Sequence, residues 1–378
     1  MRLAVVSTAI PPASSGQARV LGQVLDGLDA LFLSDAAQPG AGTAPLAPAR
    51  FLLAPRLGSG RVNNLAGLAV TVFARAGEIA RRARAHRAEA ILGCSGSPFD
   101  PPAAWLAAER LRLPFGAWLF DDPVLQWPAA DGTPYRVFAR FWERLWARRS
   151  VPLAPNEVMA ADFARRNPRS RPPVLVRNPA ANAAFGDPAA PWPRDAAAPL
   201  RVLYTGSVYA AQADAVRNLV TALADEPGFA LALRTPQGAA ELAAQGIAGV
   251  AILPPLPHAE ALAEQQRADI LFLPLAFDAA IPEVIRSSAP AKAAEYLASG
   301  RPVLVHAPPG AYVNRLFHGA GLVVDRPEPL LLLAALRRLR DDAALRGGLL
   351  AEAALRAPGF RVAASRAAML AALGGDRR

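Results

Sequence analysis

A short segment of the chain holds the side chains whose types and spacing are best suited to chemistry. Lys292 is the only lysine among the 41 lysine and arginine residues. Lysine supplies a compact ammonium that the planar guanidinium of arginine does not replace. Glu295 comes one helical turn later, on roughly the same face of a predicted helix. An ammonium beside a carboxylate suits a ligand that carries both phosphate charge and sugar hydroxyl groups.

The pattern around Lys292 predicts a helix N-terminus that binds an anion. Ser288 and Pro290 precede a predicted helix over 291–298, and serine before a proline-initiated helix is typical of an N-cap that leaves backbone N–H groups facing the loop. A lysine in the first turn is unfavourable beside the helix dipole unless an anion also binds. We therefore expect these N–H groups, Ser288 and Lys292 to hold a diphosphate, with Glu295 near a sugar hydroxyl pair. The alternative is a capped helix whose Lys292 and Glu295 are solvated.

The elements that must position this helix alternate between short apolar runs and alanine-rich stretches. Continuous apolar strands with helices between them predict parallel sheets covered on both faces, and their spacing predicts βαβ units in doubly wound sheets. The predicted strands are Leu3–Ser7, Ala30–Leu33, Phe51–Ala54, Ala90–Gly93, Phe115–Phe120, Val151–Leu153, Val174–Val176, Arg201–Tyr204, Ala230–Arg234, Val250–Leu253, Asp269–Leu273, Pro302–His306 and Gly321–Val324.

Segment 186–199, GDPAAPWPRDAAAP, divides the predicted strands into two groups. It is rich in proline and has no hydrophobic periodicity, which is typical of a linker. We therefore expect an α/β chain with two Rossmann-like domains, at 1–185 and 200–357, facing each other across a cleft. A helix within 358–378 is expected to pack back on the first domain, and segment 36–50 to form a surface loop.

The composition excludes several classes of protein. With 378 residues, of which 53% are hydrophobic and 19% charged, the chain is long enough for two domains and too apolar to be mainly disordered. Its uninterrupted apolar runs are too short to span a membrane, and Met1–Ile10 meets a proline pair too soon for an export signal. The single cysteine, Cys94, excludes an intrachain disulfide framework. We expect a cytoplasmic protein.

The net charge of +10 favours anionic partners. Segment 136–149 is one source of this charge, since its arginines recur every four residues between aromatic side chains. Such a helix suits an anionic membrane surface; the alternative is a domain helix with its apolar side in the core. No nucleic-acid module is recognisable, so we expect no nucleic-acid partner. The histidines lack metal-ligand spacing, and we predict no metal site.

The stretch from Ser288 to Val305, S-x-P-x-K-x-x-E-Y-L-A-S-G-R-P-V-L-V, resembles the C-terminal nucleotide-sugar site of the "group 1" retaining GT-B glycosyltransferases. Residues 1–16 resemble the first strand of that family and its P-x-x-x-x-G loop. Residues 151–178 resemble the segment that closes its first domain, and YTGS at 204–207 resembles the first strand and loop of its second domain. The resemblance thus covers nearly the whole chain.

The resemblance implies a nucleotide-sugar donor bound mainly by the second domain, an acceptor bound mainly by the first, and no required metal or other cofactor. It assigns the ribose contact to Glu295. The family's first glutamate falls on Ser287, and the Arg and Lys that follow its YTG strand are replaced by Ser207 and Gln212. Lys292 and Arg286 would then have to neutralise the leaving diphosphate. The expected donor contacts are Gly16, Gly206, Ser207, Arg286, Ser288, Lys292 and Glu295.

Two positions of the first domain are candidates for the same reaction. Gly16 follows the first strand and would let the backbone approach the donor phosphates at the start of a helix over 17–28; the alternative is an ordinary loop glycine. Asp121 and Asp122 follow the strand Phe115–Phe120. One of them, for which we choose Asp122, would orient or deprotonate an acceptor hydroxyl; the alternative is an aspartate that caps the next turn. Asp122 and Lys292 are the predicted catalytic residues.

These expectations favour one function and leave others open. The favoured function is transfer of a sugar from a nucleotide sugar to a glycan or lipid-linked acceptor, in bacterial surface polysaccharide or glycoconjugate assembly. Such an enzyme would be cytoplasmic, with peripheral contact to the inner face of the cell membrane as a further expectation. One alternative is a non-catalytic GT-B-fold protein that binds a glycoconjugate or membrane. Another is an epimerase or hydrolase on the same scaffold.

Overall fold

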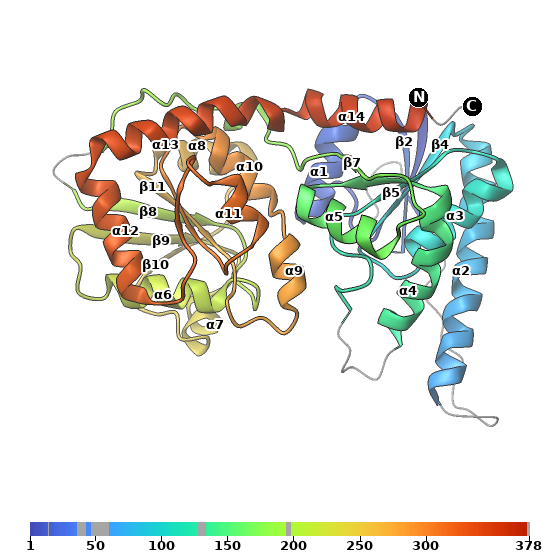
Figure 1. Cartoon of the computed structure of the whole chain (residues 1–378), viewed down its shortest axis with the longest axis horizontal. Helices are drawn as coiled ribbons and strands as arrows, with labels where there is room; N and C mark the ends of the chain where they lie inside the picture. The colour runs from blue at the N-terminus through green and yellow to red at the C-terminus, as the bar shows by residue number, and fades with distance from the viewer. Residues whose placement is uncertain (14, 36–42, 47–59, 128–133, 194–197, 376–378) are drawn as a thin grey trace. The chain divides into compact units, whose positions relative to one another are not determined.

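The computed structural model describes residues 1–13, 15–35, 43–46, 60–127, 134–193 and 198–375. These residues form two compact units (Figure 1). The first comprises Met1–Arg177 with Ala363–Arg378, and the second comprises Asn178–Val362. Within the described ranges, no helix is long and apolar enough to cross a membrane.

The first unit is built on a seven-stranded parallel sheet in the order β3-β2-β1-β4-β5-β6-β7. The order reverses between β1 and β4, and loops at the carboxyl ends of such neighbouring strands form the usual ligand crevice of open α/β sheets. The strands are β1 (Arg2–Val6), β2 (Asp29–Ser34), β3 (Thr43–Pro45), β4 (Ala90–Cys94), β5 (Phe115–Trp118), β6 (Val151–Ala154) and β7 (Val174–Leu175). The helices are α1 (Gly16–Leu25), α2 (Gly60–Ala85), α3 (Asp100–Leu111), α4 (Tyr135–Trp146), α5 (Glu157–Arg166) and most of α14 (Val362–Gly374).

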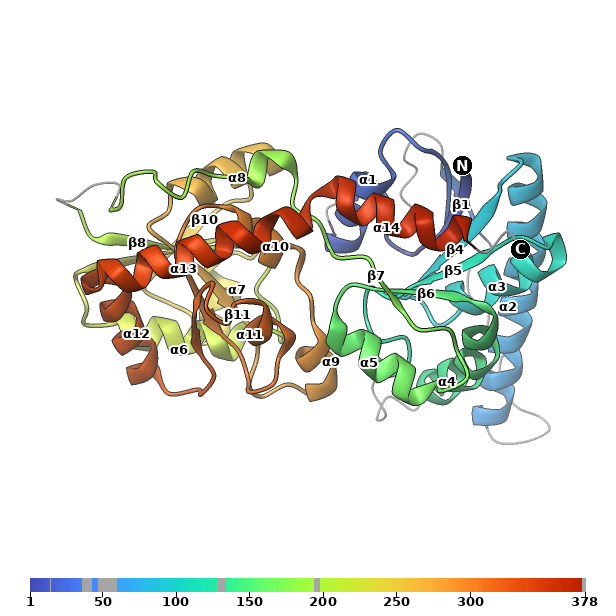
Figure 2. The ribbon, with the colours of Figure 1, turned by 45° about the horizontal axis from the view of Figure 1, so that its top comes forward.

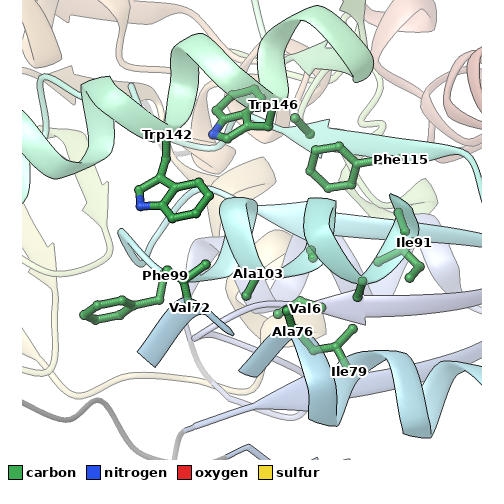
Figure 3. Packing of buried hydrophobic residues seen from close by; sticks show 14 of the residues in the cluster. Val6, Val72, Ala76, Ile79, Ile91, Phe99, Ala103, Phe115, Trp142 and Trp146 are labelled. Atoms are coloured by element: carbon green, nitrogen blue, oxygen red, sulfur yellow. The ribbon is translucent and has the colours of Figure 1, made fainter. Parts of the chain in front are cut away.

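Helices cover both faces of this sheet, which explains why its central strands are apolar without alternation. On one face, side chains of α2, α3 and α4 pack on β4 and β5; Figure 3 shows Trp146 of α4 beside Phe115 of β5. On the other face, α14 lies beside α1 (Figure 2). Its Arg366 Nε donates a hydrogen bond to the Val24 carbonyl over 2.8 Å, and its Leu373 packs on Gly116 of β5.

The second unit has a six-stranded parallel sheet in the order β10-β9-β8-β11-β12-β13, which is the Rossmann order. Its reversal point lies between β8 and β11. The strands are β8 (Leu200–Thr205), β9 (Phe229–Arg234), β10 (Ala251–Leu253), β11 (Ile270–Pro274), β12 (Val303–His306) and β13 (Leu322–Val324). The helices are α6 (Ala213–Leu223), α7 (Ala239–Ala244), α8 (His258–Arg267), α9 (Pro282–Ser287), α10 (Ala291–Ala298), α11 (Tyr312–Leu316), α12 (Pro329–Asp341) and α13 (Ala343–Arg356). The predicted α/β class with two Rossmann-like parallel sheets is confirmed.

The chain passes from the first unit to the second at Arg177–Asn178, before the segment expected to be the linker. The described part of that segment, 186–193, is bonded to the second unit. Gly186 N donates to the Ala298 carbonyl over 2.9 Å, and the indole N–H of Trp192 donates to the Asp269 carbonyl over 2.8 Å. Proline content thus marks a segment without helix or strand here, but one with fixed partners.

Two expectations for the first unit concern segments that the structure covers only in part. Most of the predicted loop 36–50 lies outside the described residues, and its described centre is the short strand β3, which pairs with β2. The predicted strand Phe51–Ala54 lies entirely outside the described residues.

Candidate functional site

The candidate residues of the second unit gather where β8 ends and α10 begins. Lys292, in the first turn of α10, donates a hydrogen bond from Nζ to Tyr204 Oη over 2.7 Å, and its ammonium lies 4.0 Å from the centre of that ring. Tyr204 is a buried residue of β8, and its hydroxyl donates to the carbonyl of Ser207 in the following loop. The YTGS segment and the start of α10, both predicted to belong to the site, are therefore joined through Tyr204.

Gly206 makes this arrangement possible. Its φ of +119° lies in a region that L side chains rarely adopt, and a Cβ added there would lie 2.6 Å from Lys292 Nζ. A glycine is required both for the backbone turn and for the close approach of the ammonium. The backbone conformation at Gly206 and the position of the Lys292 ammonium are thus coupled at the carboxyl edge of the sheet.

The phenol that contacts the ammonium is electrically neutral. Burial raises the pKa of Tyr204 well above its ordinary value, with smaller contributions from Tyr296 and Tyr209. The phenol therefore stays protonated at neutral pH and orients the ammonium of Lys292 without cancelling its charge. A cation held in this way, beside backbone N–H groups at a helix start, can balance the charge of a bound phosphate.

Glu295 lies one turn further along α10 and is buried. Its Oε1 is 2.8 Å from Nε2 of His258, the first residue of α8, and its Oε2 accepts a hydrogen bond from Gln265 Nε2 over 3.3 Å. The Glu295 side chain is 3% exposed and the His258 side chain 31%. The pair thus presents mainly the imidazole to solvent.

The predicted site did not include His258, because the scattered histidines lack metal-ligand spacing. A different signal was available. His258 follows the irregular segment Pro254–Pro257 directly after β10, at the start of a helix. Polar residues at the carboxyl end of a parallel strand belong among the site candidates whether or not they can bind metal.

The predicted serine N-cap of α10 is wrong. Pro290 occupies that position, without a side-chain cap, and Ser288 is instead the C-cap of the short helix α9. Proline has no side-chain acceptor, and at this helix start the Pro290 carbonyl accepts a hydrogen bond from Ala293 N over 2.9 Å. Asn178 Nδ2 anchors the connecting residues by donating to the Ala289 carbonyl over 2.7 Å. Ser288 and Arg286 are half-buried in this connection, and their ligand roles stay predictions.

Gly16 is the exposed first residue of α1, at the carboxyl end of β1 in the first unit. The N-cap of α1 is Ser15, whose Oγ accepts a hydrogen bond from Ala18 N over 3.1 Å. Nearby, Gln17 Nε2 donates to Ser7 Oγ over 2.8 Å. The glycine lies at the reversal point of the sheet, where its predicted contact with phosphate stays a prediction.

Asp122 is buried, and its carboxylate is engaged inside the first unit. Its Oδ1 accepts hydrogen bonds from Val124 N and Leu125 N over 2.9 and 2.8 Å, and its Oδ2 pairs with Arg166 over 2.7 Å. Arg166 also binds the buried carboxylate of Glu143 over 3.1 Å. These contacts are those of the turn-capping alternative, and the catalytic role of Asp122 stays a prediction.

Of the residues that the structure describes, no three His, Cys, Asp or Glu side chains form a group that could hold a metal ion.

No family model and no curated protein sequence matches the chain. Solved structures nevertheless resemble it over its whole length. HepE from Anabaena, solved with UDP and glucose, gives a TM-score of 0.68 at 17% identity and covers 99% of each chain. An α,α-trehalose-phosphate synthase from Burkholderia xenovorans, solved with glucose-6-phosphate, gives 0.69 at 12% identity over 99% of this chain and 100% of that chain. Sucrose-phosphate synthase from Thermosynechococcus elongatus gives 0.65 at 17% identity over 97% of each chain.

At these identities the similarity concerns the fold. It extends over both Rossmann-like sheets, so the chain has the two-domain GT-B fold of these solved structures.

Proposed function

We propose that the chain is a glycosyltransferase that moves a hexosyl group from a nucleotide sugar to a glycan or lipid-linked acceptor, in bacterial surface polysaccharide or glycoconjugate assembly. One observation carries the proposal: the ammonium of Lys292, at the start of α10, is held against the Gly206 loop at the carboxyl edge of the second sheet. This edge of a Rossmann-like sheet is where nucleotides and their phosphates bind. HepE, whose structures hold UDP and UDP-glucose, supports the proposal.

In the proposed reaction, the bond between the anomeric carbon and the diphosphate breaks, and that carbon forms a bond to an acceptor oxygen, whose proton passes to a base. The leaving diphosphate gains negative charge as its bond breaks. Lys292 and the N–H groups at the start of α10 stabilise this charge from fixed positions, so little reorganisation is needed. Arg286 and Ser288, in the connection before α10, add a second cation and a hydroxyl.

The remaining roles follow the predicted residues. Glu295, held by His258, binds the ribose, and Ser207 with Gly206 contributes loop backbone to the donor. In the first unit, Gly16 is the proposed contact to the donor phosphates and Asp122 the proposed contact to the acceptor hydroxyl.

We also propose that the enzyme belongs to the retaining group 1 family and works without a metal ion, since Lys292 supplies the positive charge. Turnover in excess EDTA is then expected to equal turnover without it.

A panel of nucleotides and nucleotide sugars, read by thermal shift on the full chain, tests donor binding. We expect one nucleotide class to raise the melting temperature, by roughly 5 °C at a hundredfold excess over Kd. Arg315→Ala, which removes an exposed cation of α11, is expected to keep this response. No response to any member of the panel would contradict the proposal.

The non-catalytic alternative gains no support from the comparisons, because similar structures hold UDP, UDP-glucose or glucose-6-phosphate.

A further inference from the structure

The large exposed apolar side chains of the first unit gather on two helices. Val70 and Phe73 lie on α2, and Val137, Phe141 and Leu145 lie on α4; each is between 40% and 58% exposed. The rings of Phe73 and Phe141 both contact Trp142, with ring centres 6.0 and 5.6 Å away. The five side chains therefore belong to one region, which we call the α2–α4 surface.

Core packing does not account for this surface. Helix α4 carries two apolar stripes at four-residue spacing. Phe138, Trp142 and Trp146 are buried in the core of the unit (Figure 3 shows the two tryptophans). Val137, Phe141 and Leu145 form the second stripe and face solvent. A helix that only closes a domain core needs one such stripe, and a contiguous exposed patch is typical of an interaction site.

The exposed charge on the same helix has one sign. Arg144 of α4 and Arg148, in the 3-10 turn Ala147–Arg149 that follows it, are exposed beside the apolar stripe, and Arg136 is half-exposed at the start of α4. The acidic residue of α4, Glu143, is fully buried and paired with Arg166, so the solvent face of this helix carries no carboxylate. Arginines beside exposed aromatic and aliphatic side chains are complementary to a surface that is anionic outside and apolar beneath.

Of the arginines that recur every four residues in segment 136–149, Arg140 does not belong to this face. Arg140 donates a hydrogen bond to Asn167 Oδ1 over 3.0 Å and to the Arg166 carbonyl over 2.9 Å. Sequence spacing alone placed it with the others.

We propose that the α2–α4 surface docks the protein on a bilayer that contains anionic lipids. Phe73, Phe141 and Leu145 enter the boundary between headgroups and acyl chains, while Arg144 and Arg148 bind lipid phosphates. The stripe from Val137 to Leu145 is about 12 Å long at 1.5 Å per residue, so the contact is shallow and interfacial. The proposal that this surface binds a bilayer does not depend on the proposed function. Its use in reaching a lipid-linked acceptor rests on the proposed function.

Vesicle sedimentation with the full chain tests the surface. The probes are vesicles of phosphatidylcholine alone and of phosphatidylcholine with 30% phosphatidylglycerol, at roughly physiological salt, where headgroup attraction is still felt within a Debye length. We expect at least about tenfold tighter binding to the anionic vesicles. Equal binding to both compositions, or no binding to either, would overturn the proposal.

Two double variants separate the contributions. Phe73→Ser with Phe141→Ser is expected to weaken binding to anionic vesicles about tenfold or more, and Arg144→Glu with Arg148→Glu to abolish it. The matched control is Leu330→Ser with Leu355→Ser, which removes two more strongly exposed apolar side chains from the second unit; we expect no change. Wild-type binding by either surface variant would overturn the proposal.

The arginine variant changes only exposed side chains, so its result does not depend on core packing. Two other partners are outcomes of the same test. A dimer that Phe73→Ser with Phe141→Ser dissociates, without vesicle binding by the wild type, would assign the surface to a second copy of this chain. Binding to duplex DNA as tight as to anionic vesicles would assign it to nucleic acid. The thermal-shift response to nucleotide sugars, measured without vesicles, is expected to be normal in all variants, so this inference and the proposed function can fail separately.

Discussion

The sheets of the two units share the Rossmann strand order, with one further strand in the first, but charged side chains near them are held in different ways. In the first unit, the carboxylates of Asp122 and Glu143 meet a cation, Arg166. In the second, the ammonium of Lys292 rests on a neutral phenol, and Glu295 rests on an imidazole. A carboxylate paired with a cation offers little charge to a ligand, whereas the contact of Lys292 with the Tyr204 phenol does not itself neutralise the ammonium. Both sheets have a reversal point in their strand order, and the different contacts of Asp122 and Lys292 are why we propose the second as the anion site.

The largest expected effect comes from removing the cation of the second sheet. Lys292→Ala is expected to lower kcat by about 100-fold or more, because the leaving diphosphate loses a fixed donor. Its circular dichroism and melting temperature are expected to stay near those of the wild type. The control is Arg315→Ala, with normal kcat. Normal turnover of Lys292→Ala would remove this residue from the mechanism and erase the difference between the two sheets.

In the first unit, substitution of Asp122 is expected to lower stability. Asp122→Ala removes a buried acceptor of two backbone N–H groups and a partner of Arg166, which is expected to cost about 3 kcal/mol in the free energy of unfolding. Urea unfolding measures this loss, and the thermal-shift response to nucleotide sugars is expected to persist. Asp122→Asn, which can still accept from the turn, separates the roles: a stable but inactive Asn variant would make this carboxylate catalytic.

A second buried carboxyl group of the first unit, that of Asp100, is expected to make the free energy of unfolding depend on pH. Burial raises the pKa of Asp100 to about 7, against the opposing effect of the adjacent Arg75. The unfolded chain releases this proton near 3.8, so the folded state binds more protons between about pH 4 and 7. The free energy of unfolding therefore falls as pH rises through this range, by up to about 1.4 kcal/mol per pH unit.

Urea unfolding followed by tryptophan fluorescence measures this slope, since every tryptophan except Trp192 lies in the first unit. Asp100→Asn is expected to flatten it. An unchanged slope in that variant would assign the effect to another group.

The close approach of the Lys292 ammonium to Gly206 can be tested by substituting the glycine. Gly206→Ala places a Cβ against the ammonium of Lys292 and strains the backbone, so we expect about tenfold weaker donor binding. Calorimetry with the nucleotide sugar found by the panel measures it. Gly347→Ala in α13, where an added Cβ meets open space, is the control. Equal affinity for both variants would show that the loop tolerates a side chain.

The smallest expected effect comes from removing the imidazole of His258, which contacts the Glu295 carboxylate. His258→Ala leaves Glu295 buried with one hydrogen-bond partner fewer, and we expect about fivefold weaker nucleotide binding, equivalent to about 1 kcal/mol. His258→Gln, which retains a donor, is expected to recover part of the loss, and His318→Ala serves as an exposed control. A full loss in the Gln variant would point to a contact that needs the imidazole itself.

Sequence periodicity predicted the fold well, because the strands of both sheets are continuous apolar runs. The helix expected over 291–298 has those bounds in the structure. The same pattern misplaced Ser288, since a six-residue helix, α9, leaves too little periodicity to recognise, and the N-cap of α10 is Pro290.

The residues of the candidate site could be named from the sequence, but their contacts could not. A unique lysine is visible in a sequence, whereas Tyr204 and His258, which orient Lys292 and Glu295, come from elements far away along the chain. Asp122 has the sequence context of a site residue, and only its pairing with Arg166 shows how its carboxylate is engaged. Partners distant in sequence follow from strand order, which one sequence does not determine.

Helix α14 makes the first unit discontinuous in sequence. Met369 and Leu373 are fully buried in it, although nearly two hundred residues of the second unit separate them from Arg177. During synthesis, the early sheet therefore leaves the ribosome with one face incompletely covered, and it must wait for the later lobe to be made before its own packing is finished. Expressing the N-terminal half for biochemical work would accordingly require grafting α14 onto it, because a cut at Arg177 would leave apolar surface exposed and prone to aggregation.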